Sequence, residues 1–265
     1  MEFWQFLVAL MQGLLEWLPI SSQGQTVLFV YNLGAVPVES LIALTVWLHL
    51  GTMFSVLVRY PRDILNIISA RDRNLLKLLL IATIGTGIVG VPIYLVRKIA
   101  LATILGSRLN LVVGLLLLAT AAFLYASRKR TQEAGVDNPE RIPTDKEALV
   151  TGLTQGLSIL PGLSRSGITV SSLLMQKVGK ETALKFSFLM SVPAVLGIFA
   201  LELITGDLAI ATVGLTDLLL MDVIAFCVGL ASMEALLRLS RRVSFWKLCV
   251  FIAVVAIAFG IPAFL

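Results

Sequence analysis

The stretch Pro161-Gly-Leu-Ser-Arg-Ser-Gly-Ile-Thr169 interrupts a long apolar segment of this chain. An arginine at membrane depth costs from about 3 to more than 10 kcal/mol, so it normally faces a polar cavity or a partner. The proline and the two glycines disfavour continuous helix, and non-helical backbone at that depth must be covered by protein or water. We therefore expect a buried anion site here, next to a helix that starts at about Ile168.

The composition indicates a polytopic membrane protein. Hydrophobic residues make up 58% of the 265 residues, charged residues make up 14%, and the mean hydropathy is +0.94, values outside the usual range of soluble domains. The net charge of +5 comes mostly from basic residues between the apolar segments, so it does not indicate nucleic-acid binding. Cys227 and Cys249 lie inside apolar segments and predict neither a disulfide framework nor a zinc site.

Apolar segments long enough to cross a bilayer, about 20 residues each, predict six transmembrane helices. Two other apolar stretches, 3–33 and 146–178, are interrupted midway, which predicts two re-entrant helical hairpins. Residues 3–18 lack a basic leader and are expected to belong to the mature protein. The expected fold is an all-α polytopic membrane protein, and its six spans are expected at 40–58, 74–96, 108–128, 182–203, 216–238 and 245–265.

The two halves of the chain resemble each other. Gly13-Leu-Leu-Glu-Trp-Leu18, followed by Pro19-Ile-Ser-Ser-Gln-Gly-Gln-Thr26, is similar to Gly152-Leu-Thr-Gln-Gly-Leu157, followed by Pro161–Thr169. We expect one membrane domain over 1–265, built from repeat 1 (about 1–130) and repeat 2 (about 146–265) with opposite topology, each a hairpin plus three spans. Inverted repeats place a ligand site near the membrane midplane. An accidental match of short apolar stretches is the alternative.

Three basic clusters, in 59–77, 128–146 and 238–247, predict the orientation in a plasma membrane. Short basic loops stay cytoplasmic. Both chain ends are then expected outside, with the first hairpin entering from outside and the second from the cytoplasm.

The second hairpin carries the residue types that bind phosphate. Arg165 is a fixed cation, and a guanidinium pairs with phosphate through two hydrogen bonds. Backbone N–H groups at a helix start add donors. The hydroxyls of Ser164, Ser166 and Thr169 lie beside them in the sequence. The alternative is that Arg165 only reaches the membrane surface or pairs with an acid.

The first hairpin carries a carboxylate. Gln12 and Glu16 are four residues apart and share one helix face, directed towards a loop with Ser21, Ser22 and Gln25. An intramembrane carboxylate beside hydroxyls can bind a divalent cation or accept a proton. In the alternative, Glu16 only pairs with Arg165, which would still bring the hairpins together.

These motifs resemble those of the undecaprenyl-diphosphate phosphatase family, also called the bacitracin-resistance family. The likeness rests on Gln12-x-x-x-Glu16 before Leu-Pro-Ile-Ser-Ser, and on Pro161–Thr169 followed by Phe186-Ser-Phe-Leu-x-x-x-Pro193. It implies a phosphatase that releases the terminal phosphate of a polyprenyl diphosphate and so recycles the lipid carrier for envelope or glycan synthesis. It further implies a divalent cation (Mg²⁺ or Ca²⁺) and a site that opens to the extracytoplasmic side.

The resemblance also implies residue roles. Ser22 matches the proposed nucleophile, Gln12 and Glu16 match the acidic motif, and Ser164, Arg165 and Thr169 match the phosphate-binding motif. One position departs from the family pattern: Gln25 stands where the usual loop has a histidine, which fits an archaeal-type member. The only histidine, His49, lies in a predicted span, where we expect a hydrogen-bonded core histidine or a substitute for the loop histidine.

We expect Arg165 to hold the diphosphate, Glu16 to bind the cation and accept a proton, and Ser22 or a water to attack the phosphorus. The expected partners are the polyprenyl diphosphate and membrane lipids, with no nucleic acid. A homo-oligomer is left open. The alternative function is a transporter of polyprenyl phosphate or another anionic lipid, since broken helices in inverted repeats are typical of transporters.

Overall fold

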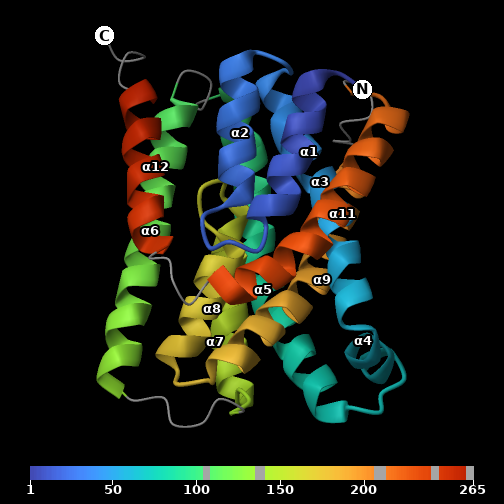
Figure 1. The fold of residues 1–265 in the computed structure, drawn as a ribbon, viewed down its shortest axis with the longest axis vertical. Coiled ribbons are helices and arrows are strands. Elements are labelled where there is room, and N and C mark those ends of the chain that lie inside the picture. Colours follow the sequence, from blue (N-terminus) through green and yellow to red (C-terminus); the bar gives the residue numbers. More distant parts are fainter. Residues whose placement is uncertain (104–107, 135–140, 206–212, 240–244, 261–265) are drawn as a thin grey trace.

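A computed structural model describes residues 1–103, 108–134, 141–205, 213–239 and 245–260. All regular structure in these ranges is helical, and the helices form one bundle (Figure 1). The elements are α1 (Phe3–Leu15), α2 (Ser22–Leu33), α3 (Val38–Arg59), α4 (Pro61–Ile68), α5 (Arg73–Thr103), α6 (Leu109–Ala134), α7 (Asp145–Gly156), the 3-10 turn η1 (Leu157–Ile159), α8 (Arg165–Met175), α9 (Lys180–Thr205), α11 (Leu215–Leu239) and α12 (Phe245–Gly260).

Five of these helices are long and apolar enough to cross a membrane, which confirms a multi-pass membrane protein. Their apolar parts are Ser40–Arg59, Arg73–Val96, Leu109–Arg130, Lys180–Thr205 and Leu215–Met233. The sixth predicted span corresponds to α12, whose apolar part, Trp246–Phe259, falls among the shorter helices. Residues 261–265 of that predicted span lie outside the described ranges.

Each of the two interrupted apolar stretches forms a pair of helices, and the two pairs meet in the middle of the bundle. The first hairpin is the pair α1 and α2, and the second hairpin is the pair α7 and α8. Figure 1 shows α1 and α2 descending from one end and turning midway, while α7 and α8 rise from the opposite end and turn at a similar height. Their tips are in direct contact: the Gly162 N–H donates to Ser21 Oγ at 3.1 Å, and the Ser166 hydroxyl donates to the Leu18 carbonyl at 3.1 Å. Residues far apart in the sequence thus meet at the centre.

Glycines allow each hairpin to lie close to a long helix of the other half of the chain. A Cβ at Gly13 on α1 would lie 2.7 Å from Val228 Cβ on α11. On α7, a Cβ at Gly152 would overlap the backbone of Ala82 on α5. The first hairpin is therefore fixed by the second half of the chain, and the second hairpin by the first half.

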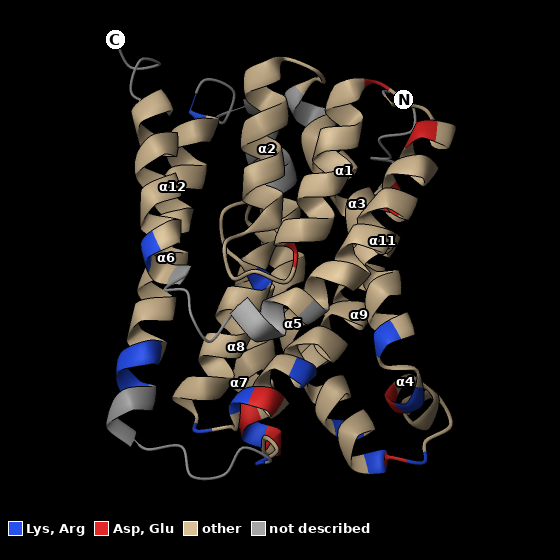
Figure 2. Cartoon of the chain, viewed as in Figure 1, with Lys and Arg blue, Asp and Glu red and all other residues tan. Residues whose placement is uncertain are grey.

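Charge gathers at one end of the bundle. Figure 2 shows most Lys and Arg residues at the end where α4 lies and where α5 and α7 begin, whereas the N-terminus and the end of α12 lie at the opposite end. The third predicted basic segment, 238–247, leads into α12. In this view α12 begins about halfway along the bundle, so its start lies away from the end where most Lys and Arg residues gather. Between the two ends, the described charges are few.

Candidate active site

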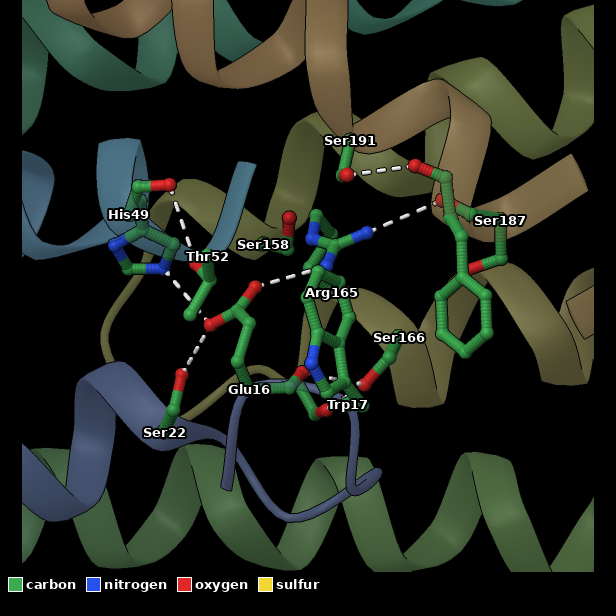
Figure 3. A network of polar contacts seen from close by, with 12 residues as sticks. Glu16, Trp17, Ser22, His49, Thr52, Ser158, Arg165, Ser166, Ser187 and Ser191 are labelled. Atoms are coloured by element: carbon green, nitrogen blue, oxygen red, sulfur yellow. Dashed lines mark hydrogen bonds and ion pairs between the residues drawn. The ribbon is translucent and has the colours of Figure 1, made fainter. Parts of the chain in front are cut away.

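Glu16 is the centre of a polar network at the hairpin tips (Figure 3). The residue caps the C-terminus of α1, and its side chain is only 4% exposed. Its Oε2 accepts hydrogen bonds from Ser22 Oγ at 2.6 Å and Gln12 Nε2 at 2.9 Å, and lies 3.2 Å from His49 Nε2. Its Oε1 accepts from Arg165 Nη2 at 2.8 Å. The carboxylate thus joins both hairpins and α3.

Arg165 is held in place from several sides. Its Nη1 donates to the Ser187 carbonyl at 3.2 Å, and its guanidinium carbon lies 5.8 Å from the centre of the Trp17 ring. The Trp17 N–H in turn donates to the Gly229 carbonyl at 2.9 Å. Arg165 Nε is buried and has no hydrogen-bond partner among the described residues. The arginine is therefore fixed, and its Nε–H is still available to donate to a ligand.

The helix of the second hairpin starts three residues earlier than the sequence predicts. It begins at Arg165, because Ser164 takes the N-cap position and accepts a hydrogen bond from the Gly167 N–H at 3.1 Å. Ser21 does the same for α2, accepting from the Gly24 N–H at 3.2 Å. Ser21 and Ser164, two of the three serines predicted to bind substrate, thus cap helices with their hydroxyl oxygens, and both are buried.

Three other predicted residues lie around the network without contacting the Glu16 carboxylate. The hydroxyl of Thr169 lies 2.6 Å from that of Ser187 and also donates to the backbone of its own helix. Ser166 donates to the first hairpin's backbone, as described above. The Gln25 amide donates to the Ile20 carbonyl at 3.3 Å. These contacts hold the loops in place.

A cavity of about 330 Å³ adjoins the network. His49 and Arg165, which both contact Glu16, form part of its wall. Polar side chains also come from α2, α5, α7 and η1, whereas α3, α5 and α9 supply an apolar wall. The lining residues are Gln23, Val46, His49, Thr83, Thr86, Gly87, Gly90, Val91, Gln155, Ser158, Ile159, Arg165, Pro193, Ala194, Val195, Gly197, Ile198 and Leu201.

The sequence points to His49 with two alternative roles, but it misses three residues of the cavity wall. His49 is brought to Glu16 by α3, and its Nδ1 contacts the Thr45 carbonyl. Gln23 lines the cavity, whereas Gln25, two residues later, does not. Gln155 and Ser158 line it from the second hairpin. For Gln23, Gln155 and Ser158, the match of Gln155 to Glu16 in the two repeats was the one sequence signal available.

The residues at Glu16 fit a resident divalent cation poorly. Donors surround both of its oxygens, and at least one would have to leave before a cation could bind. Nowhere in the described ranges do three or more His, Cys, Asp or Glu residues gather in a metal-binding group. Glu16 as a metal ligand therefore stays a prediction, and no step below depends on it.

The fold and site define a class: a polytopic membrane protein with a buried arginine, carboxylate and serine beside an apolar cavity. The chain belongs to the family of the bacitracin resistance protein BacA, whose family model matches residues 5–258. The family resemblance of the motifs is thereby confirmed.

Named relatives match over almost their whole length. The chain is 39% identical over 250 residues to an undecaprenyl-diphosphatase of Methanothrix thermoacetophila, covering 94% of this chain and 93% of that protein. It is 33% identical over 270 residues to an undecaprenyl-diphosphatase of Methanopyrus kandleri, covering 99% and 97%. A third, from Korarchaeum cryptofilum, is 36% identical over 265 residues, covering 91% and 92%. All three relatives are archaeal.

Proposed function

We propose that this protein is a membrane phosphatase that hydrolyses a polyprenyl diphosphate to the monophosphate and inorganic phosphate. The observation that carries the proposal is the contact of Ser22, Glu16 and Arg165 beside a largely apolar cavity. Such a site offers a nucleophile, a base and a cation to the headgroup of a lipid. The family and the names of its relatives support the same reaction.

Ser22 is the proposed nucleophile. Its hydroxyl already donates to Glu16 at 2.6 Å, the geometry of a nucleophile paired with its base. As Ser22 Oγ attacks the terminal phosphorus, its proton passes to Glu16. The bond from phosphorus to the bridging oxygen breaks, and the polyprenyl monophosphate leaves. Glu16 passes its proton to the leaving monophosphate and is free to accept one from the water that attacks the phosphoserine. The bond from phosphorus to Ser22 Oγ then breaks, Ser22 takes the proton back from Glu16, and inorganic phosphate leaves.

Arg165 supplies most of the charge stabilisation in this scheme. Its guanidinium is fixed by Glu16 and the Ser187 carbonyl, and its Nε has no hydrogen-bond partner within the described ranges. A fixed cation in a poorly solvated site stabilises charge that develops on phosphate oxygens without first reorganising. A divalent cation carried by the diphosphate would further neutralise those oxygens.

His49 is the proposed proton carrier in place of the loop histidine that Gln25 replaces. Its two ring nitrogens face acceptor oxygens, of Thr45 and Glu16, an arrangement that the doubly protonated ring satisfies. From this position His49 can return a proton to the leaving monophosphate by way of Glu16. Gln25, bonded to its own loop, cannot carry a proton near neutral pH.

The apolar part of the cavity is proposed to receive the start of the prenyl chain. Gly87 on α5 and Gly197 on α9 line this wall, and a Cβ added to either would meet nothing within 4 Å. A branched hydrocarbon therefore finds open space there, next to the residues that hold its diphosphate.

We further propose six spans and two re-entrant hairpins in an inverted repeat, with α12 as the sixth span. In support, the hairpins approach from opposite ends, and Ser21 and Ser164 cap equivalent helices. The repeats are then about 1–130 and 146–265 of one domain. The basic segments 59–77, 128–146 and 238–247 are proposed to be cytoplasmic in a plasma membrane, with the site opening outside.

The test is phosphate release by the purified full-length protein, in detergent with Mg²⁺ and a polyprenyl diphosphate. Release of one inorganic phosphate per lipid monophosphate is the expected result. Absence of release, with movement of labelled lipid between leaflets in proteoliposomes, would contradict the phosphatase and favour the transporter.

A further inference from the structure

Gln23 offers a free acceptor oxygen at the cavity, beside the proposed nucleophile. It directly follows Ser22 in the first turn of α2, and it lines the cavity together with Arg165 and His49. Its Nε2 donates to Thr45 Oγ1 on α3 at 3.0 Å. Its Oε1 accepts no hydrogen bond from the described residues and remains accessible to water. The reaction proposed above leaves this oxygen without a role.

The contact with Thr45 decides which end of the Gln23 amide is free. The Thr45 hydroxyl donates its one proton to the Ile42 carbonyl at 2.7 Å. Thr45 can therefore only accept from Gln23, which directs the NH₂ group to α3 and leaves the oxygen for the cavity. Thr45 lies one helical turn before His49, and its carbonyl contacts His49 Nδ1. The amide is thus held beside the part of α3 that reaches Glu16.

The chemistry of the amide oxygen selects its ligand. A phosphate oxygen is itself an acceptor and repels it. A hydrocarbon chain brings no donor and would bury the oxygen without a hydrogen bond, at a cost of about 1–3 kcal/mol. A water molecule donates to the amide and keeps a lone pair for the phosphorus, and glutamine side chains orient the attacking water in this way in GTP-hydrolysing proteins. The free oxygen of Gln23 therefore suits a nucleophilic water.

A nucleophilic water is needed in the second half of the proposed reaction. Ser22 and His49 approach Oε2 of Glu16, whereas Arg165 approaches Oε1 (Figure 3). Because the prenyl chain is proposed to lie in the cavity, the lipid monophosphate departs on that side. The water that takes its place then arrives where Gln23 lines the wall.

We infer that the amide oxygen of Gln23 positions the water that hydrolyses the phosphoserine. The inference rests on the proposed phosphatase function. The water donates one hydrogen bond to Gln23 Oε1 and gives its other proton to Glu16 as its oxygen bonds to phosphorus. The bond from phosphorus to Ser22 Oγ breaks, and Ser22 regains its proton from Glu16. Gln23 exchanges no proton and acts by positioning alone.

The test follows the two halves of the reaction separately. Purified protein in detergent with Mg²⁺ is mixed rapidly with excess polyprenyl diphosphate and quenched with acid. Lipid monophosphate, inorganic phosphate and phosphorylated Ser22 are then measured at each time. Gln23→Met, which keeps the side-chain length and removes the amide, is expected to release one lipid monophosphate per protein in a burst. Later release of inorganic phosphate should be roughly 100-fold slower than in the wild type, with most of the protein held as phosphoserine.

Two further variants separate positioning from structure. Thr45→Val removes the acceptor that orients the amide, so it should also raise the share of phosphoserine, by less than Gln23→Met does. Gln5→Met is the matched control, because Gln5 is a buried glutamine of the first hairpin that does not line the cavity. Its share of phosphoserine should equal that of the wild type. Should Gln23→Met fail to fold, Thr45→Val decides the question.

A share of phosphoserine in Gln23→Met no larger than in the wild type would overturn the inference. Slower release without more phosphoserine would do the same, because it would place Gln23 in substrate binding or in the attack by Ser22. Failure of the underlying function gives a different result. A wild-type protein that forms neither inorganic phosphate nor phosphoserine would remove the phosphatase itself.

Discussion

Ser22 Oγ lies 2.6 Å from Glu16 Oε2, with the serine at the first residue of α2 and the glutamate just past the end of α1. One tight turn thus places a hydroxyl and its proton acceptor in contact. The Arg165 guanidinium binds the other oxygen of the same carboxylate. Attack, proton transfer and charge stabilisation can therefore occur around one side chain.

Ser22→Ala is expected to lower phosphate release at least about 100-fold, because it removes the group that Glu16 would deprotonate. The measurement is release of inorganic phosphate, joined with mass spectrometry of the wild type quenched during turnover, which should show a phosphorylated Ser22. Near-normal release by Ser22→Ala would assign the attack to water.

His49→Ala is expected to lower release roughly 100-fold, as loss of a general acid or base does. Gln25→Ala should cost far less, because the Gln25 amide bonds to the Ile20 carbonyl and does not line the cavity. Adding Gln25→His to His49→Ala should restore nothing. Restoration of release in this double variant would show that the loop position faces the phosphate after all.

Gly197→Leu is expected to discriminate between substrates by chain length. The added side chain would occupy space that a Cβ finds open, beside Pro193 and Ile198 in the cavity wall. Release from a long prenyl diphosphate should fall roughly 10-fold relative to release from a five-carbon diphosphate. An equal change for both substrates would place the prenyl chain elsewhere.

Gly152→Ala is expected to destabilise the protein by about 1–3 kcal/mol, as overpacking does. The new methyl would overlap the backbone of Ala82, which α5 cannot easily withdraw. Gly87→Ala is the control. Gly87 also lies on α5, but it faces the cavity, and a Cβ there meets nothing within 4 Å. Thermal unfolding in detergent should show a lower midpoint for Gly152→Ala alone; equal midpoints would contradict the close α5–α7 contact.

Most of the helical layout was predictable because hydropathy alone marks long apolar helices. The expected spans at 40–58 and 182–203 correspond to α3 (Val38–Arg59) and α9 (Lys180–Thr205). The helix start at Arg165 was missed by three residues, because the sequence does not reveal which of two serines caps the helix. In the structure Ser164 takes that position, and the cap sets which way each following side chain points.

The site was predictable only in part, and for a related reason. Motif spacing brought Gln12, Glu16 and Ser22 together, since all three lie within one hairpin. His49 depends on how α3 packs against the hairpin, which spacing along the chain does not encode. The sequence predicted that the hydroxyls of Ser21 and Ser164 bind the substrate, yet both serines cap helices in the structure. Long-range packing decides both points.

The contact between Glu16 and Arg165 is tested most directly by phosphate release from a polyprenyl diphosphate in detergent. Glu16→Ala and Arg165→Ala should each abolish release while eluting and unfolding as the wild type does. Arg62→Ala, which removes an exposed arginine of α4, should release phosphate normally. Near-normal release by Glu16→Ala or Arg165→Ala would contradict an active site formed where the two hairpins meet.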